Sequence, residues 1–163
     1  GGGVLPIATV IKTMPNNNLE NIYNFLKLSD SIATAGQPTP EQFTIIKLSN
    51  YQVVINLALL DSPNALANEE SIVKSLGMEY IHIPVIWENP TLEDITRFFS
   101  VMKDFSNKRV FIHCAANKRV SAFICLYIIH QKINKEQAQK DLNRIWIPNK
   151  KWQDFIQQVL DHC

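Results

Sequence analysis

Residues 110–121 read Val-Phe-Ile-His-Cys-Ala-Ala-Asn-Lys-Arg-Val-Ser, and this stretch decides the fold that we expect. The apolar run that ends at His113 is typical of a strand buried on both faces of a parallel sheet. The apolar segment from Val120 to His130 is long enough for a central helix. A strand, a short loop and a helix in this order predict a binding site, because ligands of open α/β sheets lie beyond the carboxyl ends of the strands.

The chain around this stretch alternates between short apolar runs and amphipathic segments. We predict strands at 31–35, 53–57, 80–85 and 109–113, and helices at about 19–26, 40–48, 69–76, 92–105, 120–130, 135–144 and 151–162. Thr39 and Thr91 are expected to cap helices, with Gln42 and Asp94 at the third helical position. The alternation predicts a three-layer α/β domain with a mostly parallel central sheet of about four strands, flanked by helices, whose central strand ends at His113.

Length and composition indicate one folded domain. The 163 residues are 46% hydrophobic and 19% charged, and we expect an extended lead-in at 1–18 followed by a single domain at 19–163. A net charge of +1 gives no reason to expect nucleic acid or a membrane as a partner. No apolar run reaches the roughly 20 residues of a membrane span. The sequence does not indicate an oligomeric state.

The chain has three cysteines, Cys114, Cys125 and Cys163. An odd number without a close pair argues against a disulfide framework. A reducing, cytoplasmic compartment is the simpler interpretation, and export after removal of a signal peptide stays open. The histidines show no ligand spacing with the cysteines, so neither a metal site nor a cofactor is expected.

Cys114 stands where a strand gives way to a helix. Backbone N–H groups at a helix start favour an anion, and the same field lowers the pKa of a cysteine there. Arg119 could hold two oxygens of that anion in a fork. This combination predicts attack on a phosphate monoester through a cysteinyl-phosphate intermediate. The alternative is that Cys114 is a small buried hydrophobe, which is how we interpret Cys125.

His113-Cys114 followed by Arg119 and Ser121 resembles the signature loop of protein tyrosine and dual-specificity phosphatases. A wider resemblance, over about residues 28–157, is to a bacterial branch of that family known as DUF442. The segments that carry it are 35–39, 55–57, 80–85, 87–91 and 146–155. The resemblance implies a cysteine-phosphatase fold, a phosphorylated protein or small molecule as substrate, and no cofactor.

The same resemblance implies roles for individual residues. Cys114 would be the nucleophile, Arg119 the phosphate clamp, and His113 the residue that orients the loop and helps to keep the cysteine ionised. The phosphate would be bound by the loop and the helix start, through Ala115, Ala116, Asn117, Lys118, Arg119 and Ser121.

The sequence departs from the best-known phosphatase loop in three ways. Four residues, not five, separate Cys114 from Arg119; Asn117 replaces a glycine; and Val120 follows the arginine, with the hydroxyl at Ser121. The short spacing also resembles the loops of rhodaneses, which hold a persulfide sulfur. A sulfurtransferase or persulfide carrier is therefore an alternative, and a non-catalytic phosphate-binding module is a third.

A phosphatase of this kind needs an acid that protonates the leaving oxygen. Glu88 is the only carboxyl group on the loop 85–91, where such an acid normally lies, and it is our first candidate. Asp94 follows closely but is also explained by its place at a helix start. Asp61, on another loop after a strand, is the third candidate.

Overall fold

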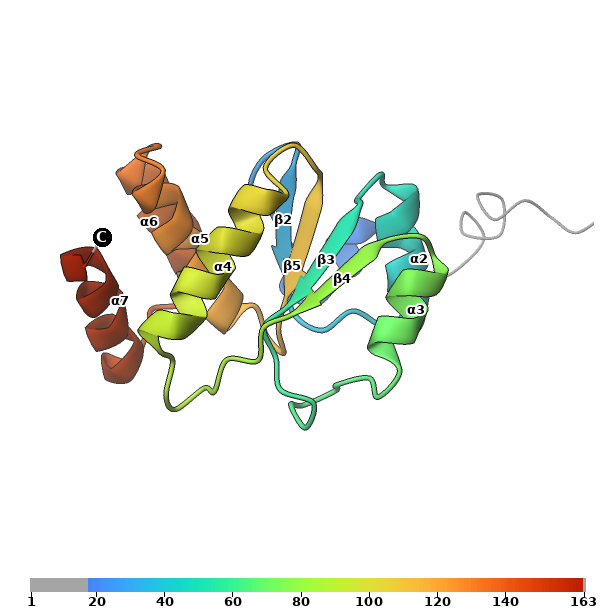
Figure 1. The fold of residues 1–163 in the computed structure, drawn as a ribbon, viewed down its shortest axis with the longest axis horizontal. Coiled ribbons are helices and arrows are strands. Elements are labelled where there is room, and N and C mark those ends of the chain that lie inside the picture. The colour runs from blue at the N-terminus through green and yellow to red at the C-terminus, as the bar shows by residue number, and fades with distance from the viewer. Residues whose placement is uncertain (1–17, 163) are drawn as a thin grey trace, which may run out of the picture.

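The computed structural model describes residues 18–162, and these form a five-stranded sheet with helices on both faces (Figure 1). The strands are β1 (Leu26–Lys27), β2 (Ile32–Ala35), β3 (Val53–Asn56), β4 (Glu79–His82) and β5 (Val110–His113). The helices are the 3-10 turn η1 (Leu19–Asn21), α2 (Pro40–Leu48), α3 (Glu69–Ser75), α4 (Leu92–Asp104), α5 (Lys118–His130), α6 (Lys135–Ile145) and α7 (Lys150–His162). The expected lead-in, apart from Asn18, and Cys163 lie outside the described residues.

The strand order is β1-β2-β5-β3-β4, so β5 is the central strand. It runs parallel to β2 on one side and to β3 on the other, and β4 is parallel to β3. The predicted three-layer α/β architecture is therefore confirmed, as is a central strand that ends at His113. Because the four parallel strands share a direction, their carboxyl ends lie at one edge of the sheet, and the loops that follow them meet there.

The prediction of a helix at 19–26 is wrong. Only one 3-10 turn forms, and the chain then enters β1, a two-residue strand that pairs antiparallel with β2. Asn24 adopts a φ of 50°, which ends any helical run, and Leu26 turns into the core while Lys27 faces solvent. This edge strand is also the reason that the sheet has five strands and not about four.

Alternate residues of the inner strands divide between two cores. Val53, Ile55, Val110 and Ile112 pack under α4, α5, α6 and α7. Val54 and Phe111 face the other way and pack against Phe43 and Ile46 of α2 and Val73 of α3. Both faces of each strand are therefore buried, which explains why these strands read as continuous apolar runs.

Two helix starts follow the sequence closely. Both expected capping boxes are present, Thr39 with Gln42 at α2 and Thr91 with Asp94 at α4. Each box satisfies backbone N–H groups that a helix start leaves unpaired. No helix among residues 18–162 is long and apolar enough to cross a membrane.

Candidate active site

Cys114 follows β5 directly and therefore lies at the edge of the sheet where the parallel strands end. Its backbone N–H donates to the carbonyl of Ala35 at 3.3 Å, which continues the sheet pairing by one residue. Its side chain is 1% exposed, yet it lines an open cavity of about 530 Å³. Cys114 is therefore buried and still borders an open cavity.

The loop after Cys114 is held from its outer side. The N–H of Gln37 donates to the carbonyl of Ala115 at 3.1 Å, and Nδ2 of Asn24 donates to the carbonyl of Ala116 at 3.1 Å. A trans peptide directs its N–H opposite to its carbonyl, so the N–H of Ala116 points away from Gln37. These contacts fix the path of the loop before any ligand binds.

The loop leads directly into the first turn of α5. Asn117 is the N-terminal cap residue but makes no capping hydrogen bond with its side chain. The first intrahelical bond runs from the N–H of Ser121 to the carbonyl of Asn117 at 2.8 Å. The N–H groups of the first turn therefore lack a side-chain cap, and with the helix dipole they favour an anion beside Cys114.

Asn117 has a structural task that its position in the loop explains. Its φ is 66°, the left-handed region that a glycine would occupy at least cost. Its side chain is fully buried, and Nδ2 donates to the Asn24 carbonyl at 2.8 Å and to Oγ1 of Thr34 at 3.0 Å. It is not among the residues that line the cavity. Its side chain thus holds the loop to the sheet and is not placed to bind a ligand.

Arg119 lies in the first turn of α5 and is 6% exposed. Its Nη1 donates to the Val85 carbonyl at 2.9 Å, which ties the guanidinium to the loop after β4. Arg119 lines the same cavity as Cys114, together with Ala115, Ala116 and Lys118. Since a guanidinium has five N–H donors, this anchor leaves others for an anion in the cavity.

The structure separates the three candidate acids. Glu88 and Asp61 both line the cavity, on the loops after β4 and β3. Asp94 accepts a hydrogen bond from the N–H of Thr91 at 3.1 Å in its capping box and is not part of the cavity lining. Asp94 therefore caps the start of α4, and of the three candidates only Glu88 and Asp61 line the cavity.

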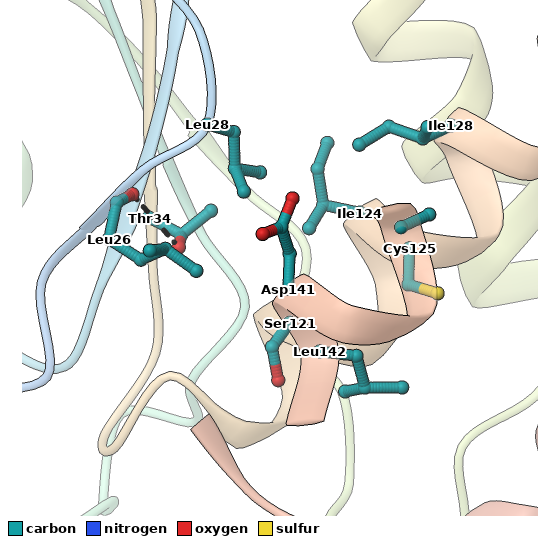
Figure 2. Close-up of a pocket in the computed structure, with 10 residues that line it drawn as sticks. Leu26, Leu28, Thr34, Ser121, Ile124, Cys125, Ile128, Asp141 and Leu142 are labelled. Atoms are coloured by element: carbon teal, nitrogen blue, oxygen red, sulfur yellow. Dashed lines mark hydrogen bonds between the residues drawn. The ribbon is translucent and has the colours of Figure 1, made fainter. Parts of the chain in front are cut away.

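Ser121 lies elsewhere than the resemblance implies. Its hydroxyl donates to the Lys118 carbonyl at 2.9 Å and accepts from the indole N–H of Trp146 at 3.1 Å. Figure 2 shows it beside a different cavity of about 10 Å³, whose lining includes Cys125 and Asp141. The hydroxyl is thus bonded away from the cavity of Cys114, and we assign Ser121 no part in phosphate binding.

A buried polar network supports the loop from beneath. Nε2 of His113 lies 2.7 Å from Oε2 of Glu69, and Nδ1 lies 3.2 Å from the Cys114 carbonyl. Oε1 of Glu69 accepts from Nε2 of Gln37 at 2.7 Å, and Tyr80 supplies a further hydrogen bond. Glu69 is 3% exposed and His113 is fully buried.

Two pKa shifts follow from this network. Burial alone would raise the pKa of Glu69, but the charge of His113 and the hydrogen bonds from His113, Gln37 and Tyr80 outweigh it, so the pKa lies below its ordinary 4.5. Burial, followed by the charge of Glu69, raises the pKa of the Tyr80 hydroxyl well above its ordinary value. Glu69 is therefore ionised, and Tyr80 remains a hydrogen-bond donor.

The sequence analysis missed Glu69 as a site residue. A glutamate in the first turn of a helix is sufficiently explained by the helix dipole, so nothing in its spacing distinguished it. Gln37 gave a weak signal, since it belongs to the turn 35–39 that carries the family resemblance. The contact between Glu69 and His113 joins positions that are 44 residues apart, and only the fold reveals it.

Three tryptophans pack beside the cavity. The ring centres of Trp87, Trp146 and Trp152 lie 5.3 to 6.1 Å apart, and the indole N–H of Trp152 donates to the Trp87 carbonyl at 3.0 Å. The ammonium of Lys118 lies 5.7 Å from the centre of the Trp146 ring. This cluster fixes the loop that carries Glu88, and Trp87 itself lines the cavity. In residues 18–162, no three His, Cys, Asp or Glu side chains gather in a group that could hold a metal ion.

Comparison with known proteins identifies the family. Residues 14–157 match the family described as DSP-PTPase phosphatase fused to NAD⁺ kinase. The chain belongs to this phosphatase family. It is also similar to the DUF442 protein of Shewanella putrefaciens CN-32, which is described as a candidate phosphatase. The two chains are 34% identical over 88% of this chain and 95% of that one, with a TM-score of 0.79.

Solved structures with lower sequence identity share the fold of this chain. One is the core catalytic domain of the PP-IP phosphatase SIW14 from S. cerevisiae, at 18% identity over 83% of this chain and 85% of that one, with a TM-score of 0.69. Another is kinase-associated phosphatase with serine in place of its catalytic-site cysteine, at 14% identity over 85% and 93%, with a TM-score of 0.72. No curated protein sequence matches the chain. The resemblance to tyrosine and dual-specificity phosphatases and to DUF442 is thereby confirmed.

Proposed function

We propose that the protein hydrolyses phosphate monoesters, of the protein phosphotyrosine and dual-specificity type, through a cysteinyl-phosphate intermediate on Cys114. The observation that carries this proposal is the joint placement of Cys114 and Arg119 around one open cavity, at the uncapped start of α5. A thiolate, helix-start amides and a guanidinium are the groups that a transferring phosphoryl group needs around it.

The proposed reaction has two steps. The thiolate of Cys114 attacks phosphorus, so that the S–P bond forms while the bond from phosphorus to the leaving oxygen breaks. A carboxylic acid on the cavity wall gives its proton to that leaving oxygen. Water then attacks phosphorus, the same carboxylate takes a proton from the water, and the S–P bond breaks to release phosphate. Arg119 and the amides hold the three non-bridging oxygens throughout.

Charge in the cavity lining supports a substrate with a single phosphate. Two cations, Lys118 and Arg119, stand against two carboxylates, Asp61 and Glu88. A polyphosphorylated ligand would meet these carboxylates with its additional phosphates, and like charges repel. The name of SIW14 says that it acts on PP-IP. We expect this chain to prefer a monophosphate with an apolar body, which would lie against Leu59 and Trp87.

The intermediate provides the decisive test. Purified protein is mixed with an aryl phosphate, quenched in acid within the first turnover and analysed by mass spectrometry, and we expect a phosphate on Cys114. Cys114→Ser should abolish both adduct and turnover, while Cys125→Ser, at the second buried thiol, serves as the matched control and should retain both. Turnover that persists in Cys114→Ser would overturn the proposal.

The acid is tested by a second matched pair. We propose Glu88, since it lies on the loop that the Trp87 cluster fixes, and Asp61 is the alternative on the opposite loop. Glu88→Gln should lower kcat about 10²-fold or more for an alkyl phosphate, and much less for an ester whose leaving group needs no proton. Asp61→Asn should show little of this dependence on the leaving group. A reversed result would assign the acid to Asp61.

Sulfur transfer is the second candidate, and the loop of four residues between Cys114 and Arg119 favours it. Under this alternative, thiosulfate would leave an added sulfur on Cys114, and phosphate esters would leave no adduct. If both reagents fail while sulfate still protects Cys114 from alkylation, the site is a non-catalytic phosphate-binding module. Mass spectrometry of the adducts and of alkylated Cys114 therefore separates the three functions.

A further inference from the structure

We infer that Glu69 is a positioning residue for Cys114, and that it acts by keeping a proton on both ring nitrogens of His113. This inference rests on the proposed function, because it assigns Glu69 to the activation of the proposed nucleophile. Glu69 itself lies on α3 and is absent from the cavity lining, so it acts on the loop through its partners. Two of these lead to the loop, His113 and Gln37, and we assign the effect on Cys114 to the imidazole.

The inference starts from the two partners of the His113 ring nitrogens. Nδ1 faces the Cys114 carbonyl at 3.2 Å, and a carbonyl oxygen can only accept. Nε2 faces Oε2 of Glu69 at 2.7 Å, and an ionised carboxylate can also only accept. Both nitrogens thus face acceptors, an arrangement that matches the two N–H groups of the positively charged imidazolium. The ring is fully buried, so the carboxylate supplies the countercharge that water cannot.

The neighbours of His113 identify Glu69 as its negatively charged partner. Gln37, from the turn before α2, donates to Oε1, and the edge of the Phe43 ring packs against the imidazole with ring centres 5.9 Å apart. Tyr80 of β4 donates to Glu69 and is itself approached by His82 and by the charge of Glu70. On the other side of the ring lies Cys114. Among these titratable groups, Glu69 alone is a carboxylate in contact with His113.

An imidazolium at this place acts on Cys114 in two ways. Its positive charge lies next to the residue whose thiolate the reaction needs, in a buried region where charge interactions are strong. Its Nδ1–H also holds the Cys114 carbonyl on the outer side of the loop, so the N–H of Ala115 points the other way. Without Glu69, a buried imidazolium would have no countercharge and would lose a proton. One of the two hydrogen bonds would then be lost, together with the charge.

The test follows alkylation of Cys114 as a function of pH, in a Cys125→Ser/Cys163→Ser background where Cys114 is the only thiol. Glu69→Gln should move the pH midpoint of the reaction with iodoacetamide upward by about one unit, which is a rate about tenfold lower below the midpoint. The direction decides the inference. If His113 kept its proton without Glu69, removing a negative charge would move the midpoint downward. A downward shift or no shift therefore overturns the proposal.

Two controls separate positioning from general support of the fold. Tyr80→Phe removes another hydrogen bond to Glu69 but leaves the negative charge, so the melting temperature should fall while the midpoint stays in place. In a His113→Asn background, Glu69→Gln should cause no further shift, because its route to Cys114 is gone. A shift of full size in that background would mean that Glu69 acts by another route, such as Gln37, and would refute the inference.

Removal of one partner of a buried pair can cost about 3–5 kcal/mol, so Glu69→Gln alone could unfold the chain. The double variant Glu69→Gln/His113→Asn is neutral and should fold, and its midpoint should match that of His113→Asn alone. In the unmodified protein, ¹⁵N NMR of labelled histidine should show protons on both nitrogens of His113 at pH 7, and a neutral ring would overturn the inference. If wild-type Cys114 shows no thiolate reactivity near neutral pH, the proposed function fails instead, which is a different outcome.

Discussion

Cys114, the proposed nucleophile, and Cys125, which we interpret as structural, lie in different surroundings. Both thiols are free and almost completely buried, at 1% and 3% exposed. Cys114 lies before an uncapped helix start, above the pair of His113 and Glu69, and faces an open cavity with Arg119. Cys125 lies within α5 beside the small, mostly apolar cavity of Figure 2, where the carboxylate of Asp141 is its charged neighbour.

The charged groups and backbone dipoles around the two thiols differ. Burial, and then the charge of Asp141, raise the pKa of Cys125 to about 11. Around Cys114 the fold collects helix-start amides and cations, which stabilise a thiolate. Residue type and burial are the same at both positions, so the nearby charges and backbone dipoles account for the difference in reactivity that we expect.

The largest expected effect is the difference in alkylation between the two thiols. At pH 7 a thiol of pKa about 11 is ionised in about one molecule in 10⁴, and Cys125 is also shielded from reagents. Iodoacetate should therefore modify Cys114 at least about 10³-fold faster than Cys125, and added sulfate or phosphate should slow the reaction at Cys114 alone. Peptide mass mapping over time measures both rates. Similar rates, or equal protection by sulfate, would remove the distinction.

Arg119 offers the next test, because it forms part of the site at Cys114 and has no counterpart near Cys125. Arg119→Lys keeps the positive charge but loses the planar fork and the bond from Nη1 to the Val85 carbonyl. We expect kcat/KM to fall about 10²- to 10³-fold, the usual cost of removing one donor to a developing anion. Protection of Cys114 by sulfate should weaken in parallel. Near wild-type kinetics would refute the clamp role.

Gly36 tests how closely the fold has to hold the loop. A Cβ at this position would lie 2.7 Å from the Ala115 carbonyl and 2.5 Å from Cδ1 of Tyr23. The tyrosine is half exposed and can move, but the carbonyl belongs to the loop itself. Gly36→Ala should therefore displace the loop and lower kcat about tenfold to 10²-fold, since small misplacements around reacting groups are costly.

The matched control for this change is Gly77→Ala. Gly77 has a φ of +83°, and its nearest neighbour would be Nζ of Lys47 at 3.5 Å, so an added Cβ causes backbone strain without a clash. It should lower stability by about 1 kcal/mol and leave kcat unchanged. Thermal melts and steady-state kinetics on both variants separate the two effects. A Gly36→Ala variant that loses stability but not activity would show that the loop tolerates the shift.

The sequence predicted the layers of the fold, the parallel sheet and the central strand because those features follow from local patterns. Continuous apolar runs gave β3 and β5, and the Thr39 and Thr91 boxes gave two helix starts. The prediction of a helix at 19–26 failed because Asn24 adopts a positive φ, which composition does not reveal. Pairing with β2 then stabilises β1 through tertiary contacts, which override local preference.

For the site, too, the sequence predicted the residues close to Cys114 in the chain better than those that the fold brings to it. The cavity contains Cys114, Arg119 and Glu88, whose spacing the sequence made visible. Ser121 was expected at the phosphate from the family resemblance, but its hydroxyl accepts from Trp146. Glu69 was not predicted as part of the site, because a contact across the sheet from α3 to β5 leaves no periodic trace in the sequence. Local chemistry is therefore readable from such a chain, whereas the residues that orient it require the fold.

The smallest expected effect concerns Asp141, whose carboxylate acts on Cys125. Its carboxylate is the second cause of the raised pKa of Cys125, after burial, so Asp141→Asn should lower that pKa but leave it above the ordinary 9.0. The hydrogen bond from Gln137 and the contact with the exposed Arg144 are weak surface interactions, so stability should change by less than about 1 kcal/mol.

Thiolate absorbance between pH 8 and 11 in a Cys114→Ser/Cys163→Ser background measures the shift in the pKa of Cys125, and near-UV circular dichroism verifies that the fold persists. In the wild-type background, phosphatase activity should be unchanged. A pKa below 9 in this variant would mean that the carboxylate, and not burial, keeps Cys125 protonated.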